Sequence, residues 1–201
     1  MTMVAESVRV AMPHGVVDDR RGTWGMVMFI LTEATLFVFL FFTYYYIAFN
    51  WKGHYPPAPP KLTLALIMLV LLLASSALLH AGERAEKAGH VARARAAVGG
   101  TIVMGLVFLV LQAIEYRNHL KELTPTSDAY GSIFYTITSF HGAHLLLGLL
   151  MLGYVLVLPE IGPGRKPPHR PLHNASLYWH FVDLVWVVIV GLLYLVPNIR
   201  R

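Results

Sequence analysis

The sequence of 201 residues contains no cysteine. This absence excludes disulfides, thiolate metal sites and a cysteine nucleophile. Charged residues are also scarce, at 13% of the chain, whereas soluble domains usually have roughly 25%. Hydrophobic residues make up 56% and are gathered in long blocks instead of following the helical or strand period of a half-solvated fold. The composition therefore indicates a membrane protein.

Short catalytic motifs are missing as well. The sequence has no Walker loop, no GxSxG, no dinucleotide-binding fingerprint and no HExxH or ExxH pair, the patterns that accompany common active sites. No internal repeat is visible, which argues against a transporter built from duplicated halves. Residues 1–21 hold no apolar core before a cleavage site, so we expect a polar, uncleaved N-terminal tail. These absences predict a supporting membrane subunit with no active site of its own.

Five apolar blocks are long enough to cross a hydrocarbon core of about 30 Å. The predicted helices run from about Trp24 to Phe49, Leu62 to Ala81, Val98 to Tyr116, Tyr130 to Leu158 and Ala175 to Val196. Between the second and third, the residues from Glu83 to Ala96 are expected to form a charged, helix-compatible turn. The predicted fold class is an all-α integral membrane protein, a bundle of five transmembrane helices in one domain over residues 22–201.

The net charge of +5 comes from basic residues in the short polar segments between the blocks. Orientation signals and lipid headgroup contacts are their usual role there, so we expect membrane lipids, and no nucleic acid, as partners. With the N-terminus in the cytoplasm, ten of the 16 Lys and Arg residues lie on the cytoplasmic side and six on the other. This agrees with the positive-inside rule and places the C-terminus outside.

Glu33 lies near the centre of the first predicted helix, where a charged carboxylate costs on the order of 2.5–3.5 kcal/mol on insertion scales. On its own helix only Thr32 and Thr35 are polar neighbours. Burial favours the neutral form of a carboxyl group, so one hypothesis is a proton-exchanging carboxyl that is neutral much of the time. The alternative is a structural role, in which protonated Glu33 bonds to a neighbouring helix or to lipid.

Two pairs of polar residues stand one helical turn apart in the last two predicted helices. His141 and His144 form the first pair, and His180 and Asp183 form the second; we expect the second pair to be hydrogen-bonded within the pair. The simplest interpretation is a structural network that fixes the bundle. Two alternatives stay open: a metal site of two histidines and a carboxylate, and a haem between two facing imidazoles.

Gln112 and Glu115 lie one turn apart near the outer end of the third predicted helix. They are either polar helix ends that reach the interface or members of a functional cluster. In the fourth helix, Gly142 and Gly148 predict the close approach of a neighbouring helix, because small residues let two backbones come together.

Four stretches of the sequence resemble subunit III of the haem-copper terminal oxidases, the group that contains cytochrome c oxidase and its quinol-oxidising relatives. They are WGMVMFILTEATLFVFLFFTYYY, LQAIEY, YGSIFYTITSFHGAHLLLGLLML and LYWHFVDLVWVV, and the resemblance covers the chain after Arg21. Longer members have seven helices, so this chain is similar to a short five-helix form. In the longer form the first helix pair and the other five enclose a cleft that holds phospholipid. The resemblance implies that another subunit or lipid closes this cleft here.

The resemblance implies an accessory role in aerobic electron transport. In the family, haem and copper lie in partner subunits, the catalytic subunit reduces oxygen and pumps protons, and subunit III packs against subunit I in a complex that includes subunit II. Glu33 matches the family's membrane-embedded glutamate, related to proton uptake or lipid, and Glu115 matches the acid of its LQxxEY motif. The polar pairs of the fourth and fifth helices fall on its HGxH and WHFVD positions, where they look structural.

The resemblance leaves the electron donor open between cytochrome c and a quinol. An independent haem-binding electron carrier and a proton channel around Glu33 are the competing functions. A Soret band of the isolated chain would favour the carrier, and proton leakage into liposomes would favour the channel. The short form and the expected uncleaved N-terminus favour a bacterial plasma membrane.

Overall fold

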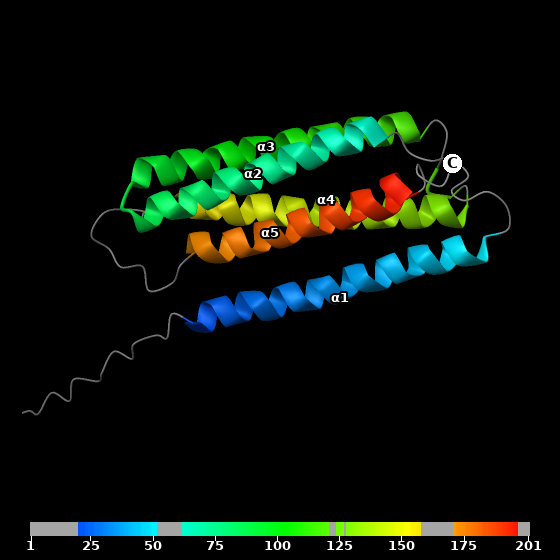
Figure 1. The fold of residues 1–201 in the computed structure, drawn as a ribbon, viewed down its shortest axis with the longest axis horizontal. Helices are drawn as coiled ribbons and strands as arrows, with labels where there is room; N and C mark the ends of the chain where they lie inside the picture. Colours follow the sequence, from blue (N-terminus) through cyan, green and yellow to red (C-terminus); the bar gives the residue numbers. More distant parts are fainter. Residues whose placement is uncertain (1–19, 52–61, 121–123, 127, 158–170, 197–201) are drawn as a thin grey trace, which may run out of the picture.

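A computed structural model of the chain describes residues 20–51, 62–120, 124–126, 128–157 and 171–196 (Figure 1). The helices are α1 (Arg20–Asn50), α2 (Leu62–Lys87), α3 (Val91–His119), α4 (Ala129–Val157) and α5 (Pro171–Ile189), and the π-helical segment η1 (Val190–Leu195) continues α5. No strand occurs in these residues. Each of the five long helices has the length and apolar composition to cross a membrane. The predicted fold class is therefore confirmed, whereas the predicted polar tail falls almost entirely outside the described residues.

The helices α2 and α3 extend beyond their predicted ends. The segment from Glu83 to Ala96, expected as a turn, is helical except at positions 88–90. Gly89 there has a φ of 79°, and the amides of Gly89 and His90 donate to the carbonyls of Glu86 and Ala85 at 2.9 and 2.8 Å. This bonding pattern is a Schellman motif, which ends a helix with a left-handed residue that is usually glycine.

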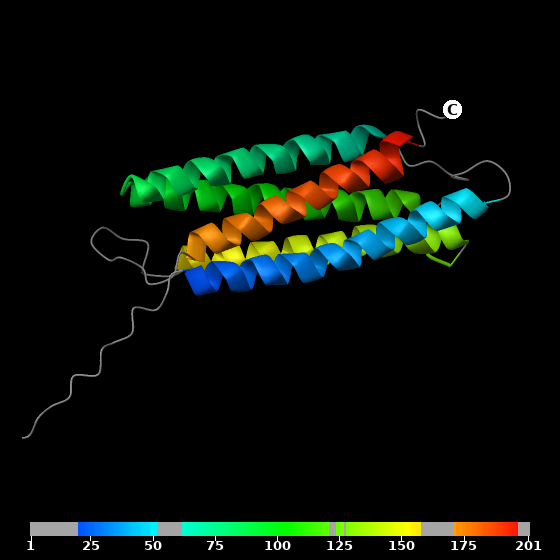
Figure 2. The same cartoon turned by 60° about the horizontal axis from the view of Figure 1, so that its bottom comes forward.

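Helix α5 is the most deeply buried helix. Figures 1 and 2 show α2 and α3 side by side, α1 on the opposite side, and α4 and α5 between them. In the most apolar 18-residue stretch of α5, 61% of the residues are buried, against 6% in α1. Trp179 and Trp186 of α5 have no exposed surface. Helix α1 packs on α4 and α5, and its outer face exposes Val38, Phe39 and Phe42.

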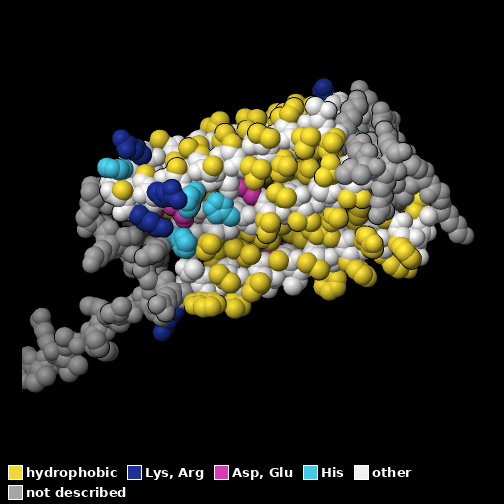
Figure 3. Space-filling model, in the orientation of Figure 1, with side chains coloured by type: hydrophobic (Ala, Val, Ile, Leu, Met, Phe, Trp, Pro, Cys, Tyr) yellow, Lys and Arg dark blue, Asp and Glu magenta, His cyan; other side chains and the backbone are white. Residues whose placement is uncertain are grey.

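Charged side chains gather at one end of the bundle. Figure 3 shows most of the Lys and Arg side chains at the end that holds the start of α1, the α2–α3 turn and the start of α5, beyond a broad hydrophobic surface. Arg84, Lys87, Arg93 and Arg95 belong to the helices at this end, and Arg117 lies near the other end of α3. This distribution is the one expected when the two ends of the bundle reach the headgroups of a bilayer.

Candidate functional site

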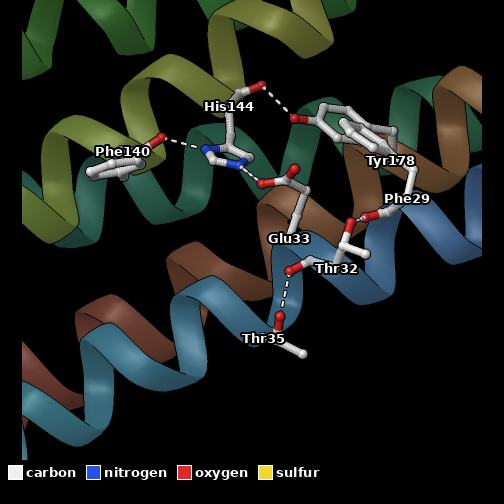
Figure 4. Close-up of polar contacts among 7 residues, drawn as sticks. All are labelled: Phe29, Thr32, Glu33, Thr35, Phe140, His144 and Tyr178. Atoms are coloured by element: carbon white, nitrogen blue, oxygen red, sulfur yellow. Dashed lines mark hydrogen bonds and ion pairs between the residues drawn. The ribbon is translucent and has the colours of Figure 1, made fainter.

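The acid of the first helix has a partner on another helix. The Oε2 atom of Glu33 lies 2.8 Å from Nε2 of His144 on α4 (Figure 4). The two side chains are 24% and 11% exposed, respectively. Thr32 and Thr35 bond to carbonyls of their own helix instead. The sequence indicated that a carboxyl group at position 33 would be costly in a membrane without a partner. The fold identifies this partner as His144, 111 positions away.

The hydrogen bond of the second ring nitrogen of His144 determines how many protons the Glu33–His144 pair carries. Nδ1 lies 2.6 Å from the carbonyl oxygen of Phe140, and because a carbonyl only accepts, Nδ1 carries a hydrogen and donates it. Nε2 and the Glu33 carboxyl must then share one proton to make their hydrogen bond. The pair is neutral overall whichever partner carries that proton, so it costs less free energy in an apolar environment than a lone carboxylate would.

Aromatic side chains surround the Glu33–His144 pair. The ring of Phe37 packs edge-on against His144 with the centroids 5.0 Å apart. The hydroxyl of Tyr178 on α5 donates to the carbonyl oxygen of His144 at 3.3 Å, and Phe29 stacks on the Tyr178 ring. Three helices therefore meet at this pair (Figure 4).

Helix α1 is attached at three polar points on one face. Besides Glu33, the Thr23 hydroxyl donates to Asn174 of α5 at 3.2 Å, and the Tyr44 hydroxyl donates to the carbonyl oxygen of Leu192 at 3.3 Å. Positions 33 and 44 are about three helical turns of 3.6 residues apart, which aligns their side chains, and position 23 lies roughly 80° around the helix from position 33. These bonds explain how a helix with so little buried surface keeps a defined rotation.

Gln112 and Glu115 lie inside the bundle, buried between its helices. The Gln112 amide donates to the carbonyl oxygen of Thr138 at 2.7 Å and to the Tyr116 hydroxyl at 3.3 Å. Glu115 accepts from the Tyr194 hydroxyl at 3.1 Å. The two residues thus join α3 to α4 and to η1, and Thr138, Tyr116 and Tyr194 are members of this cluster that sequence reasoning missed.

The two histidines of α4 face different neighbours. His144 turns to α1, whereas His141 is fully buried and stacks on Trp186 of α5, with the ring centroids 4.9 Å apart. Neither nitrogen of His141 has a hydrogen-bond partner among the residues that the structure describes. Within the same residues, no three His, Asp or Glu side chains form a group that could hold a metal ion.

The predicted glycine contacts are confirmed. A Cβ atom on Gly142 would lie 3.0 Å from the Gln112 side chain of α3, and one on Gly148 would lie 3.0 Å from the Trp179 ring of α5. Both neighbours belong to other helices, so the missing side chains allow α3 and α5 to pack closely on α4.

The predicted hydrogen bond between His180 and Asp183 was wrong. His180 Nδ1 lies 2.5 Å from the hydroxyl of Ser76 on α2, and Nε2 lies 3.2 Å from that of Ser176. Both carboxyl oxygens of Asp183 are buried without a hydrogen bond in the described part of the chain. A spacing of three residues puts two side chains on one face, but a partner across the helix interface can bond more readily.

This geometry predicts that Asp183→Leu leaves the bundle about as stable as the wild type, within about 1 kcal/mol, because no hydrogen bond is lost with an unpartnered carboxyl. His180→Leu should cost more, since it frees two serine hydroxyls. Unfolding in detergent, titrated with dodecyl sulfate and followed by tryptophan fluorescence, measures both variants. A larger loss of stability in Asp183→Leu than in His180→Leu would contradict the observed bonding and restore the predicted pair.

Comparison with known proteins places the chain beside one family. The family model described as cytochrome c oxidase subunit III matches residues 3–197. The cytochrome c oxidase subunit 3 of Synechocystis sp. is 36% identical over 90% of this chain and 78% of its own length. The probable cytochrome c oxidase subunit 3 of Mycobacterium bovis is 34% identical over 86% of each chain. The cytochrome c oxidase subunit 3 of Thermostichus vulcanus is 29% identical over 98% of each chain.

Proposed function

Because the chain belongs to the cytochrome c oxidase subunit III family, we propose that it is a non-catalytic membrane subunit that stabilises the catalytic subunit of a haem-copper oxidase and supports its proton uptake. Its relatives are cytochrome c oxidase subunits, which supports cytochrome c as the electron donor over a quinol. The proposed partners are subunit I, which this chain contacts directly, and subunit II, which belongs to the same complex. Haem and copper would be held by those subunits.

The location and orientation are part of the same proposal. The bacterial relatives support a bacterial plasma membrane. The gathering of Arg and Lys at the α2–α3 end supports a cytoplasmic N-terminus, because positive residues are retained on that side. The exposed apolar face of α1 is available to lipid or to a partner subunit, in keeping with the phospholipid site that the family resemblance implies.

The Glu33–His144 pair is the observation that carries the proton-related part of this function. In this proposal the pair holds one shared proton at membrane depth, on the helix with the least buried surface among the described helices. Movement of the proton between the Glu33 carboxyl and Nε2 of His144 leaves the pair neutral, whereas release of the proton to another group leaves the pair with one negative charge until a new proton arrives. A group of this kind suits a role in keeping a neighbouring proton path supplied during turnover.

We expect Glu33→Gln to leave assembly intact and to shorten the time over which the oxidase stays active. Glutamine can still hydrogen-bond to His144, but its amide cannot exchange a proton. Oxygen consumption recorded over many turnovers measures the decay of activity. The control is Thr35→Val, which removes an exposed hydroxyl on the same helix and should decay like the wild type. Equal decay in Glu33→Gln and the control would contradict the proposed role.

The assignment as an oxidase subunit is tested by purifying the chain with its partners in mild detergent. We expect a complex whose visible spectrum shows haem and whose other members include the catalytic subunit by mass. A chain that purifies free of any haem-containing partner would overturn the assignment. A Soret band from the chain alone would instead favour the electron-carrier function.

A further inference from the structure

A pocket opens at the charged end of the bundle, where the last turns of α2 meet the first turns of α3. Its volume is about 550 Å³. Three of the side chains that line it are exposed and basic: Arg84, His90 and Arg93. Among the described residues, no Asp or Glu lines the pocket. It is therefore a concave site whose charge is of one sign.

The two arginines of this pocket are not used by the fold. The side chains of Arg84 and Arg93 form no hydrogen bond or ion pair within the described part of the chain. The acid next to Arg84 in the sequence faces another helix, because the Glu83 carboxyl lies 3.2 Å from Nδ1 of His173 on α5. A guanidinium group without a protein partner is available to a ligand, and its planar donors suit the oxygens of a phosphate.

Short side chains form the walls of the pocket. Five alanines line it, among them Ala85 on α2 and Ala96 on α3. The two helices approach closely beside it, since a Cβ atom on Gly82 would lie 2.9 Å from that of Ala97. Two close backbones with only methyl groups along their outer side leave a groove between them. The walls of the groove are thus apolar, although its outer end is charged.

The pocket changes from charged to apolar along the axis of α2. Arg84 lies in the last turn of this helix, whereas Leu78, which lines the inner end, lies six residues earlier, or roughly 9 Å along the axis. Helix α2 has 26 residues, more than the roughly 20 that cross the hydrocarbon core, so its last turn reaches the headgroups. The charged end of the pocket is therefore at headgroup level and Leu78 is at the level of the acyl chains.

We infer that this pocket binds an anionic phospholipid of the phosphatidylglycerol type. Its phosphate accepts from the guanidinium groups of Arg84 and Arg93 and from a ring N–H of His90. Its glycerol backbone and the first part of an acyl chain lie along the alanines toward Leu78. A soluble phosphate would occupy only the charged end, and a zwitterionic lipid would bring a cation to the arginines. The change from charged to apolar along the pocket therefore favours an anionic lipid.

This site is separate from the apolar face of α1. Helix α1 packs on α4 and α5, whereas α2 and α3 lie side by side on the opposite side of the bundle (Figures 1 and 2). A lipid in the pocket contacts the helices on both sides of the turn at Gly89. It should therefore hold the ends of α2 and α3 together, whatever covers α1.

Native mass spectrometry of the full chain in mild detergent tests the site. Phosphatidylglycerol and phosphatidylcholine with the same acyl chains are titrated separately, and the dissociation constants of the first bound lipid are compared. We expect phosphatidylglycerol to bind at least about tenfold more tightly, because each Lys or Arg beside an anionic lipid contributes roughly fivefold in affinity. Arg84→Gln/Arg93→Gln should remove this preference without affecting the fold, since neither side chain bonds to the described chain.

The matched control for charge is Lys87→Gln/Arg95→Gln, which removes two positive charges from the same ends of α2 and α3. Neither residue lines the pocket, and Arg95 instead donates to the carbonyl oxygen of Leu156 at 3.2 Å. The preference of this variant for phosphatidylglycerol should stay within about twofold of that of the wild type, because the pocket keeps both of its arginines.

A second pair of variants tests the shape of the pocket at constant charge. Ala96→Leu places a larger side chain in the pocket and should weaken the binding of phosphatidylglycerol by at least about fivefold, because the lipid would clash with it. Ala92 is also exposed on α3 but does not line the pocket, so Ala92→Leu should bind the lipid like the wild type.

Equal affinity of the wild type for the two lipids would overturn the inference. An equal loss of preference in the two double variants would also overturn it, because general surface charge would then explain the binding. Glycerol 3-phosphate is the third probe. If it displaces phosphatidylglycerol at equal concentration, the pocket is a site for soluble anions and the lipid assignment is wrong. Failure to copurify with an oxidase would bear on the proposed function and leave this result unaffected.

Discussion

Gly105→Val should prevent the bundle from folding in mild detergent or leave only a small folded fraction. Gly105 lies in α3 where this helix meets α4 and α5. A Cβ atom there would lie 2.7 Å from Cδ2 of Leu149 and 2.7 Å from the ring of Trp179. Real Cβ atoms do not approach other atoms this closely, so the helices would have to separate or the neighbours would have to turn.

The neighbours of Gly105 differ in how far they can yield. Leu149 ends in a flexible side chain, but Trp179 is fully buried and its ring N–H donates to the Ser75 hydroxyl at 3.0 Å. Overpacking of a filled core costs roughly 1–3 kcal/mol, occasionally more. Because valine adds two further methyl groups beside a ring that cannot move without losing its bond, we expect the upper end of this range.

The folded fraction of Gly105→Val is measured by titration with dodecyl sulfate, followed by circular dichroism. Gly99→Val is the matched control, because Gly99 belongs to the same helix and a Cβ atom there meets nothing within 4 Å. Both substitutions change helix propensity in the same way, so the difference between the stabilities of the two variants reports the packing around Gly105. Equal stability of the two variants would show that α3 does not approach Leu149 and Trp179 as described.

The five helices could be predicted from the sequence because lipid demands long apolar segments, and such segments are visible without knowledge of the fold. Their ends were less predictable. Hydropathy falls at Glu83, but α2 continues through Arg84 to Lys87 and ends only where Gly89 adopts its positive φ. Charged residues that favour helices extend a transmembrane helix beyond the hydrocarbon.

The partners of the embedded polar groups could not be predicted in the same way. The sequence showed that Glu33 and Asp183 needed an explanation, because charge is costly at that depth. It could not show that Glu33 would bond to His144, or that His180 would bond to Ser76 and not to Asp183. These contacts depend on the rotation and depth of separate helices. The spacing of Ser76, His80 and Glu83 indicated a polar face on α2, but the residues of α5 that this face meets, His173 and His180, are known only from the fold.

The attachment of α1 should depend strongly on the Glu33–His144 pair. Glu33→Leu leaves Nε2 of His144 without its partner, and His144→Leu leaves the carboxyl of Glu33 in an apolar environment. An interhelical hydrogen bond in a membrane contributes roughly 1–2 kcal/mol in model peptides and less in some proteins, but a stranded partner adds its own cost. We therefore expect each single substitution to destabilise the chain by more than the bond alone contributes.

The double variant Glu33→Leu/His144→Leu distinguishes a specific bond from general packing. It removes both polar groups together, so it should be less destabilised than the sum of the two single variants, with a coupling of roughly 0.5–3 kcal/mol. Unfolding of the four proteins with dodecyl sulfate gives this value. Thr32→Leu is the control, since its hydroxyl bonds only to Phe29 of its own helix and should not couple to His144→Leu. Additive effects of Glu33→Leu and His144→Leu would mean that the pair does not hold α1, and the docking of this helix would then depend on Thr23, Tyr44 and the aromatic contacts alone.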